Sequence, residues 1–418
     1  MSDSSKRIPM VIWINKTSIK PFSWVLMVLL TVLPFTLLGQ NYNVKTDRFM
    51  LNLSGSAGLV YSTNVSASGL NPVSDIYAAV GISVDGAYEL SKTNRINLGI
   101  GAEYRNYFAH PEYSSSNNFL TLSPETRLAL NVRVGEIDVE FSDQLRFSAD
   151  PSNVRAYDPE RAEVVDTPIT YAHFDNTAQI KAEWDINKDY RADLILQRND
   201  LIPIQEYYDY IARSEDLIRI GINHPFSTDF SAGVSASYAQ NRYRKHFQND
   251  SRSTRYGLNA TWNATKYISF DGQIGLSQNT FKYRGNNRDT TNPSTWYMSL
   301  AMEHAVNRWL SYTVSFNRSQ SYGYVSNLIN NDVWGLSVQY LGFRKSKIIG
   351  SFYWDSGQES GGFTPEFYDR FSAEISMEFT HSKKIRSRLF YRYTQKDSNL
   401  GNRTYDQHQL GIYIYYDF

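Results

Sequence analysis

The residues best suited to electrostatic chemistry lie near the C-terminus, where charged side chains recur in steps of two and four. Such spacing places the charges of a segment on one face of a β-strand. The residues are Glu374, Glu378, Arg386, Arg388, Arg392 and Lys396. Facing acids and bases could set up a transverse field that acts on passing ions, or form cross-strand ion pairs that hold a wall rigid. The sequence leaves both interpretations open.

The same alternating face carries further acid–base pairs and several tyrosines. Glu103 and Arg105 form one pair, and Glu125 and Arg127 form another. The tyrosines could offer flat rings and hydroxyls to sugar rings, or could simply pack within the wall. They are Tyr77, Tyr107, Tyr297 and Tyr353. If this face borders an aqueous interior, all of these residues are candidates to line it.

Catalytic chemistry has little support in the sequence. The 7 histidines show no HxxxH or HExxH spacing, and no G-x-S-x-G motif is present. His173 and Asp175 form the one close same-face pair, which a hydrogen bond explains better than a catalytic dyad. The absence of cysteine excludes thiolate ligands and cysteine nucleophiles. We therefore expect no catalytic residue, no metal site, no cofactor and no enzyme activity.

Overall charge argues against a polyanionic partner. Lys and Arg together number 42, as do Asp and Glu, so the formal net charge is zero. Binding to nucleic acid normally requires a basic surface, and we expect none here.

The elements that must position these side chains are alternating β-strands. In residues 49–61 the odd positions are apolar or small and the polar residues Asn52, Ser54 and Ser56 lie between them, and similar alternation continues to the C-terminus. We count about 18 such segments, an even number with the strand length of an outer-membrane barrel. The sequence therefore predicts an all-β fold, a transmembrane antiparallel β-barrel spanning 48–418. An interior of that width would hold water.

Connections between the segments alternate strictly between short and long. Short ones include "RVGE", "NKDY" and "THSKK", whereas long ones include 149–168 and 356–368. This asymmetry predicts short periplasmic turns and long extracellular loops. Aromatic residues such as Trp184, Trp262 and Tyr267 cluster at strand ends, as expected at a lipid–water interface. A soluble β-sandwich would also alternate, but would not explain these features together.

The N-terminus reads as a secretion signal. Basic residues precede an apolar stretch that ends near Gly39, and this pattern predicts a signal peptide over 1–39. A single membrane anchor is the alternative, although the apolar run is short for one. Residues 40–47 would then form a short periplasmic segment, and the mature protein would reside in the outer membrane. Met10 is a possible alternative start.

The last residue, Phe418, shares the apolar face of the final segment with Tyr416, Ile414 and Ile412. In a closed barrel this strand pairs with the first one, which places the terminal ring at the aromatic girdle. A C-terminal aromatic on an alternating strand also resembles the signal read by the barrel-assembly machinery. We therefore expect that machinery to be a partner.

The start of the barrel resembles a family of β-barrel porins often found beside exopolysaccharide genes in Gram-negative bacteria. The resemblance rests on a Gly-containing first strand with Tyr61 and Asn64 in a Tyr-x-x-Asn pattern, followed by "SD" and a second Gly-rich strand. It implies a passive outer-membrane pore, including one for polysaccharide export, and carries over no catalytic motif.

Three functional hypotheses follow from the sequence. The first is a passive conduit for exopolysaccharide or for small hydrophilic solutes, because a wide barrel encloses water. The second is a structural or adhesive barrel that uses its long loops, and the third is an outer-membrane hydrolase. Expected partners are outer-membrane lipid and lipopolysaccharide, the assembly machinery, and either polysaccharide or small solutes.

Overall fold

A computed structural model describes most of the chain. It covers residues 44–115, 122, 126–148, 151–158, 163–170, 172–204, 206–245, 247–283, 285–323, 326–343, 345–362 and 364–418. The predicted signal peptide lies outside these residues, as do residues 40–43 of the predicted periplasmic segment 40–47. So does Glu125.

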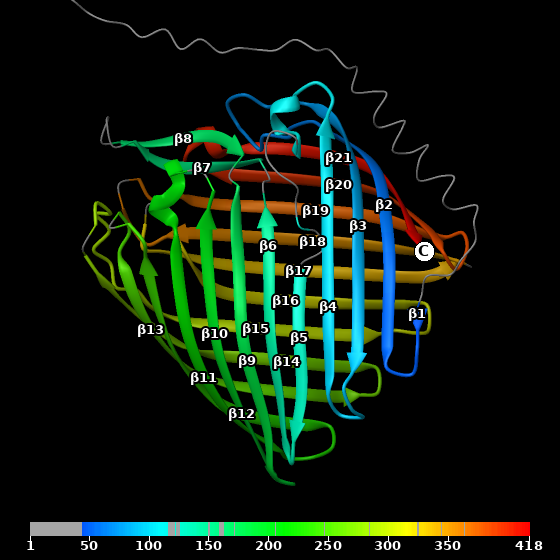
Figure 1. The fold of residues 1–418 in the computed structure, drawn as a ribbon. Helices are drawn as coiled ribbons and strands as arrows, with labels where there is room; N and C mark the ends of the chain where they lie inside the picture. The colour runs from blue at the N-terminus through cyan, green and yellow to red at the C-terminus, as the bar shows by residue number, and fades with distance from the viewer. Residues whose placement is uncertain are drawn as a thin grey trace, which may run out of the picture. The chain divides into compact units, whose positions relative to one another are not determined.

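The described residues are almost entirely β-strands, interrupted by short 3-10 helices (Figure 1). The strands are β1 (Val44–Lys45), β2 (Phe49–Ser62), β3 (Asp75–Glu89), β4 (Arg95–Tyr107), β5 (Thr126–Val134), β6 (Ile137–Ser148), β7 (Pro151–Asp158), β8 (Glu163–Thr170), β9 (His173–Asn187), β10 (Tyr190–Pro203), β11 (Arg213–Pro225), β12 (Phe230–Tyr243), β13 (Asp250–Thr265), β14 (Ile268–Lys282), β15 (Ser294–Ala305), β16 (Leu310–Tyr322), β17 (Leu328–Phe343), β18 (Ser346–Glu359), β19 (Phe367–Thr380), β20 (Ile385–Ser398) and β21 (Tyr405–Asp417). The 3-10 helices are η2 (Pro111–Tyr113), η3 (Glu206–Ile211) and η4 (Gly401–Arg403).

The long strands close into a barrel. Each pairs antiparallel with the next, and the last strand, β21, pairs with the first long strand, β2, through partners such as Leu59 and Ile412. The continuous sheet holds 19 strands, one of which is the two-residue β1 beside β2, so 18 strands form the wall. Closure leaves no free sheet edge in the wall. The predicted antiparallel barrel of about 18 strands is confirmed.

One pair of strands stands apart from the wall. β7 and β8 form a two-stranded sheet of their own, while β6 pairs directly with β9. The connection that the sequence predicts as the longest loop therefore contains a hairpin. In the parts of the chain described above, no helix has both the length and the apolar character needed to cross a membrane.

Six of the short connections share one turn mechanism. The first residue of the turn is Ser, Thr or Asn, and its side-chain oxygen accepts hydrogen bonds from the backbone N–H groups two and three residues later. Asn187, for example, accepts from Asp189 at 2.7 Å and from Tyr190 at 3.0 Å. Ser91, Ser227, Thr265, Asn307 and Ser382 do the same in their turns. These local bonds explain why strands reverse there.

The outward face of the wall is apolar and exposed. Large aliphatic side chains recur at every second position around the barrel, including Leu59, Ile220, Leu258, Ile375 and Ile412. Exposed aromatic rings lie near the short turns, including Trp184, Phe226, Trp262, Tyr267 and Trp309. A continuous apolar surface of this kind needs a nonaqueous surrounding, and an aromatic border is typical of a bilayer interface.

Toward the long-loop end the outward face becomes charged. Arg198 and Arg242 continue the outward positions of Leu196 and Tyr238, and each is about half exposed. Asp216 lies between them, with Oδ1 3.4 Å from Arg198 Nη1 and Oδ2 3.9 Å from Arg242 Nη1. These positions mark where the apolar belt ends on β10, β11 and β12.

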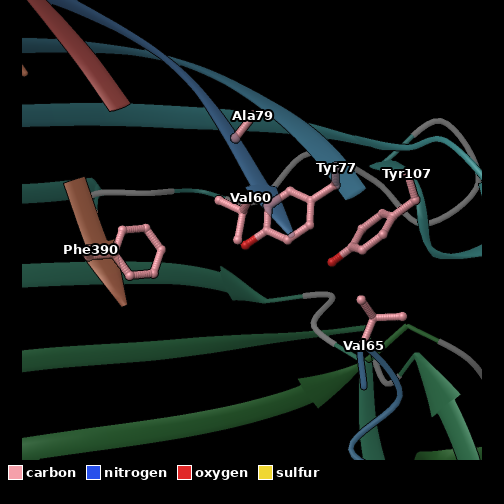
Figure 2. Packing of buried hydrophobic residues seen from close by; sticks show 6 residues of the cluster. All are labelled: Val60, Val65, Tyr77, Ala79, Tyr107 and Phe390. Atoms are coloured by element: carbon pink, nitrogen blue, oxygen red, sulfur yellow. The ribbon is translucent and has the colours of Figure 1, made fainter. Parts of the chain in front are cut away.

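Buried apolar residues form small clusters instead of one core. The largest combines Val60, Tyr77, Ala79, Tyr107 and Phe390 from the inward face with Val65 from the loop after β2 (Figure 2). A second cluster joins η3 to the loop after β12 through residues Tyr208, Tyr210, Ile211 and Phe247. The long loops are therefore packed onto the inward face and onto each other.

Candidate functional site

The inward face of β19 and β20 carries the charges that the sequence singles out most strongly. Glu374 lies between two arginines: Arg392 Nη2 donates to its Oε2 at 2.6 Å and Arg388 Nη2 donates to its Oε1. The Glu374 side chain is only 13% exposed, whereas those of Arg388 and Arg392 are 31% and 46% exposed. One carboxylate is therefore shared by two partly exposed guanidinium groups, which gives this part of the wall a net positive charge.

The neighbouring charges are paired one to one. Lys347 Nζ lies 3.0 Å from Glu378 Oε2, and Arg386 Nη2 lies 3.4 Å from Asp417 Oδ1. These pairs join β18 to β19 and β20 to β21. They behave as cross-strand ion pairs that support the wall, one of the two interpretations left open by the sequence.

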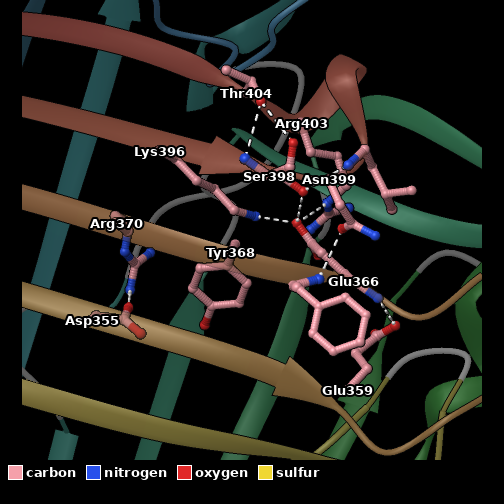
Figure 3. A network of polar contacts seen from close by, with 12 residues as sticks. Asp355, Glu359, Glu366, Tyr368, Arg370, Lys396, Ser398, Asn399, Arg403 and Thr404 are labelled. Carbon is pink, nitrogen blue, oxygen red and sulfur yellow. Dashed lines mark hydrogen bonds and ion pairs between the residues drawn. The ribbon is translucent and has the colours of Figure 1, made fainter.

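Lys396 belongs to a buried network at the long-loop end (Figure 3). Its Nζ lies 2.7 Å from Glu366 Oε1, and Arg403 Nε lies 2.9 Å from the same oxygen. Burial alone would raise the pKa of Glu366, but the charges of Arg403 and Lys396, with their hydrogen bonds, outweigh it and lower the pKa. Lys396 is thus committed to holding two loops together.

The predicted pairs of the N-terminal strands are also formed where the structure describes them. Arg105 Nε lies 2.7 Å from Glu103 Oε1 on β4. Arg127 Nη2 lies 2.9 Å from Glu140 Oε1, which joins β5 to β6. Its expected partner Glu125 lies outside the described residues.

Two of the candidate tyrosines are buried on the inward face. The rings of Tyr77 and Tyr107 lie 4.8 Å apart, centroid to centroid, within the cluster that Val65 covers (Figure 2). Asn64 anchors the covering loop, because its Nδ2 donates to Ser68 O at 2.9 Å and its Oδ1 accepts from Ser68 N. These tyrosines offer packing surface to the loop, and no exposed ring face to a solute.

The other two candidates lie close to glycines. A Cβ on Gly275 or Gly257 would collide with the ring or hydroxyl of Tyr297, and one on Gly335 would lie 3.3 Å from Tyr353 Cε1. Small residues thus make room for inward aromatic rings along the wall. Tyr353 keeps nearly half of its surface exposed, so its outer ring face remains available to the interior.

One contact crosses the interior. Tyr322 of β16 donates to Glu215 of β11, although four strands separate β11 from β16 in the sheet. A closed wall allows such a contact only through the interior. Glu215 also accepts from Asn199 at 3.1 Å, so a hydrogen-bonded chain narrows the interior at this level.

Above it, the buried carboxylate of Asp289 joins three long loops. It accepts from Thr291 Oγ1 at 2.6 Å, from Asn327 N at 2.8 Å and from Ser360 Oγ at 2.6 Å. Asn249, from a fourth loop, donates to Asp289 O at 3.2 Å. The sequence did not point to Asp289, because its partners come from loops that only the closed barrel brings together.

Water-accessible cavities remain between these contacts and the short turns. One, of about 1130 Å³, is lined by both charged and polar residues of β9 to β13, including Lys181, Asp193 and Arg219. A second, of about 770 Å³, lies against β2 to β6 and includes Asp85, Arg95 and Arg127. A third, of about 310 Å³, shares Ile195 and Arg219 with the first. Arg255, which lines only the third cavity, is a residue that sequence reasoning missed.

Phe418 follows directly on β21, which ends at Asp417. His173 Nε2 lies 3.2 Å from Asp175 Oδ2 on the inward face of β9, as expected for a hydrogen-bonded pair. Among the described residues no group of three or more His, Asp or Glu side chains is arranged to hold a metal ion.

Comparison with known proteins gives only structural matches. No family model matches the chain, and no curated protein does. Among solved structures, Pseudomonas aeruginosa OccK5 (OpdH) has a TM-score of 0.48 at 10% identity, covering 88% of this chain and 98% of its own. Pseudomonas aeruginosa OpdK has a TM-score of 0.47 at 10% identity, covering 88% and 99%, and OpdQ has 0.47 at 10%, covering 90% and 99%.

Proposed function

We propose that this chain is an outer-membrane pore, a passive conduit for small hydrophilic solutes. The supporting observation is the contrast between the two faces of a closed wall of 18 strands. The outward face is an exposed apolar belt with an aromatic border, and the inward face is charged, hydrogen-bonded and hollowed by cavities of up to about 1130 Å³. A wall that is apolar outside and wet inside encloses an aqueous path through a bilayer.

The outer membrane is the proposed location because it is where bacterial barrels of this kind reside. The N-terminal sequence supports it, since a secretion signal is needed to reach that membrane. In this orientation the short turns face the periplasm and the long loops face outside. Lipid and lipopolysaccharide then cover the belt, and the barrel-assembly machinery inserts the chain.

The narrowing of the interior favours small solutes over a polymer. Tyr322 and Glu215 meet across the interior, and the loops around Asp289 are joined above them. A polysaccharide in transit would have to break these contacts along its whole length, whereas a small solute can pass beside them. These contacts make exopolysaccharide export the weaker of the two candidate transport functions.

Reconstitution tests the proposal. Purified protein in planar bilayers should give stepwise, voltage-independent conductance, and liposomes that contain it should swell in small sugars but not in a polymer too large for the cavities. A folded barrel that neither conducts nor permits swelling would contradict the pore and favour the structural or adhesive role. Passage of the polymer would favour export.

A further inference from the structure

The 310 Å³ cavity has an unusual set of charges. Its lining includes three arginines, Arg219, Arg255 and Arg318, and no aspartate or glutamate. Arg318 is balanced nearby by Asp332, at 2.8 Å. The side chains of Arg219 and Arg255 have no hydrogen bond or ion pair with any described residue, and the Nε atom of Arg219 is buried without a partner.

Strand register brings these two arginines together. Arg219 lies opposite Ser237, and Ser237 lies opposite Arg255, so the three residues form one row across β11, β12 and β13. Their backbones are therefore two strand spacings apart, about 10 Å. Both arginines point inward, because their strand neighbours Ile218, Ile220 and Tyr256 are exposed on the apolar belt.

The row below the arginines is made of small residues. Gly221 neighbours Ser235, and Ser235 neighbours Gly257, so no large side chain from these positions fills the space beside the guanidinium groups. The hydroxyl of Tyr297 reaches this row, since a Cβ on Gly257 would collide with it. Ser237 and Tyr297 add hydroxyl groups to a cavity whose charge is positive.

Two inward carboxylates on β10 and β11 are occupied by other groups. Asp193 lies opposite Gly221 and accepts from Asn223 Nδ2 at 3.3 Å. Glu215, four residues along β11 from Arg219, accepts from Tyr322 and Asn199. A guanidinium group stays charged at all physiological pH values, and a partly buried one without a partner is costly. Elsewhere on the wall, Arg388 and Arg392 meet this cost with Glu374.

We propose that Arg219 and Arg255 form a subsite that binds the carboxylate or phosphate group of a small solute on its way through the pore. This inference rests on the proposed pore function and adds the class of solute. Guanidinium groups bind both kinds of oxyanion through paired hydrogen bonds. Since Arg219 also lines the 1130 Å³ cavity, the subsite lies where the wider space meets the narrower one.

Binding to the folded protein tests the subsite without requiring transport. Titration calorimetry of the detergent-solubilised barrel would use succinate, inorganic phosphate and the neutral butane-1,4-diol as probes. One or both anions should bind, while the diol should not. The double variant R219Q/R255Q should weaken anion binding by about tenfold or more, because it removes both guanidinium groups and their charge-assisted hydrogen bonds to the oxyanion. Comparison of succinate with phosphate shows whether the subsite prefers a carboxylate or a phosphate group.

The matched control removes the same charge from elsewhere. R198Q/R242Q takes two arginines from the outward face, and it should bind succinate and phosphate as the wild type does. Equal anion binding by R219Q/R255Q and the wild type would overturn the subsite, as would equal binding of the diol and succinate. If R219Q/R255Q does not fold, R219K/R255K keeps the charge but loses the paired geometry, and should bind more weakly than the wild type.

Conductance separates this inference from the pore function. If the wild type binds anions but does not conduct, and R219Q/R255Q loses that binding, the pore function is refuted and the subsite is retained. A wild type that conducts but binds neither succinate nor phosphate would refute the subsite alone.

Discussion

Replacing Arg388 and Arg392 with Ser should make the pore more selective for cations. In the wild type these two arginines share one carboxylate, that of Glu374, so this part of the wall carries a net charge of about +1. The double variant leaves Glu374 alone, at about −1. The wall therefore changes by two units at one level of the interior.

The size of the effect follows from Coulomb's law. Two unit charges acting on an ion about 10 Å away in water change its energy by about 0.8 kcal/mol before screening. At 0.1 M salt the Debye length is also about 10 Å, which reduces the change to about 0.3 kcal/mol. The energy of a cation in the pore falls by this amount and the energy of an anion rises by it. The cation-to-anion permeability ratio should therefore rise about threefold at 0.1 M. At 1 M the Debye length is about 3 Å and the shift should nearly vanish.

Reversal potentials under a KCl gradient measure this ratio directly. The control is R198S/R242S, which removes two arginines from the charged outward rim and should leave the reversal potential within error of the wild type. Comparison of 0.1 M and 1 M conditions separates a field effect from a change in pore shape, because only the field is screened.

An unchanged reversal potential in a folded, conducting R388S/R392S variant would refute the reasoning. It would mean that the three side chains serve the wall only as an ion-pair cluster. The free energy of unfolding should fall in either case, by about 1–2 kcal/mol, because Glu374 loses charge-assisted hydrogen bonds to partly exposed partners. Stability therefore cannot decide between the two roles, and ion selectivity can.

Three further predictions test the loops, the topology and the chain end. Glu366→Gln should lower the free energy of unfolding by about 3 kcal/mol, because it leaves Lys396 and Arg403 buried without their carboxylate. Because the pKa of Glu366 is lowered in the folded protein, the stabilisation by its carboxylate is present at neutral pH and should be lost as the carboxylate is protonated in acid. The unfolding free energies of wild type and variant should therefore converge at low pH. A constant difference between them down to acid unfolding would contradict this. Cysteine at the exposed Leu70 should react with an impermeant maleimide in intact cells and cysteine at Lys383 should not, whereas the reverse result would invert the topology. Deletion of Phe418 should reduce the yield of heat-modifiable barrel without blocking secretion, and a normal yield would remove its assembly role.

The strands could be predicted from the sequence because their evidence is local. Alternation of apolar and polar residues in a segment such as 49–61 reports two faces directly, and short turns that begin with Ser, Thr or Asn mark the reversals. The closed barrel follows from repeating that pattern an even number of times. The hairpin of β7 and β8 was missed, since these two strands pair with each other in a sheet that is separate from the wall.

The state of each inward side chain could not be predicted in the same way. The alternation of side chains along a strand places Lys396 and Tyr107 on the inward face, but whether they meet solvent depends on loops distant in sequence. Glu366 covers Lys396 and Val65 covers Tyr107. The row of Arg219 and Arg255 likewise depends on the register of three strands, which single-segment patterns do not give.

A wide barrel explains why unpaired charges on its inner wall carry information. Side chains on 18 strands cannot fill the interior, so an inward charge has two ways to avoid an unfavourable environment: it can pair along the wall or it can meet water and solutes. Glu374, Glu378 and Arg127 take the first route, and their pairs stabilise the wall. Arg219 takes the second route, because it lines two cavities and its side chain has no partner among the described residues. A solute anion that visits the cavity provides the missing partner, and a transient partner is what a conduit requires, because a permanent carboxylate there would oppose the passage of anions.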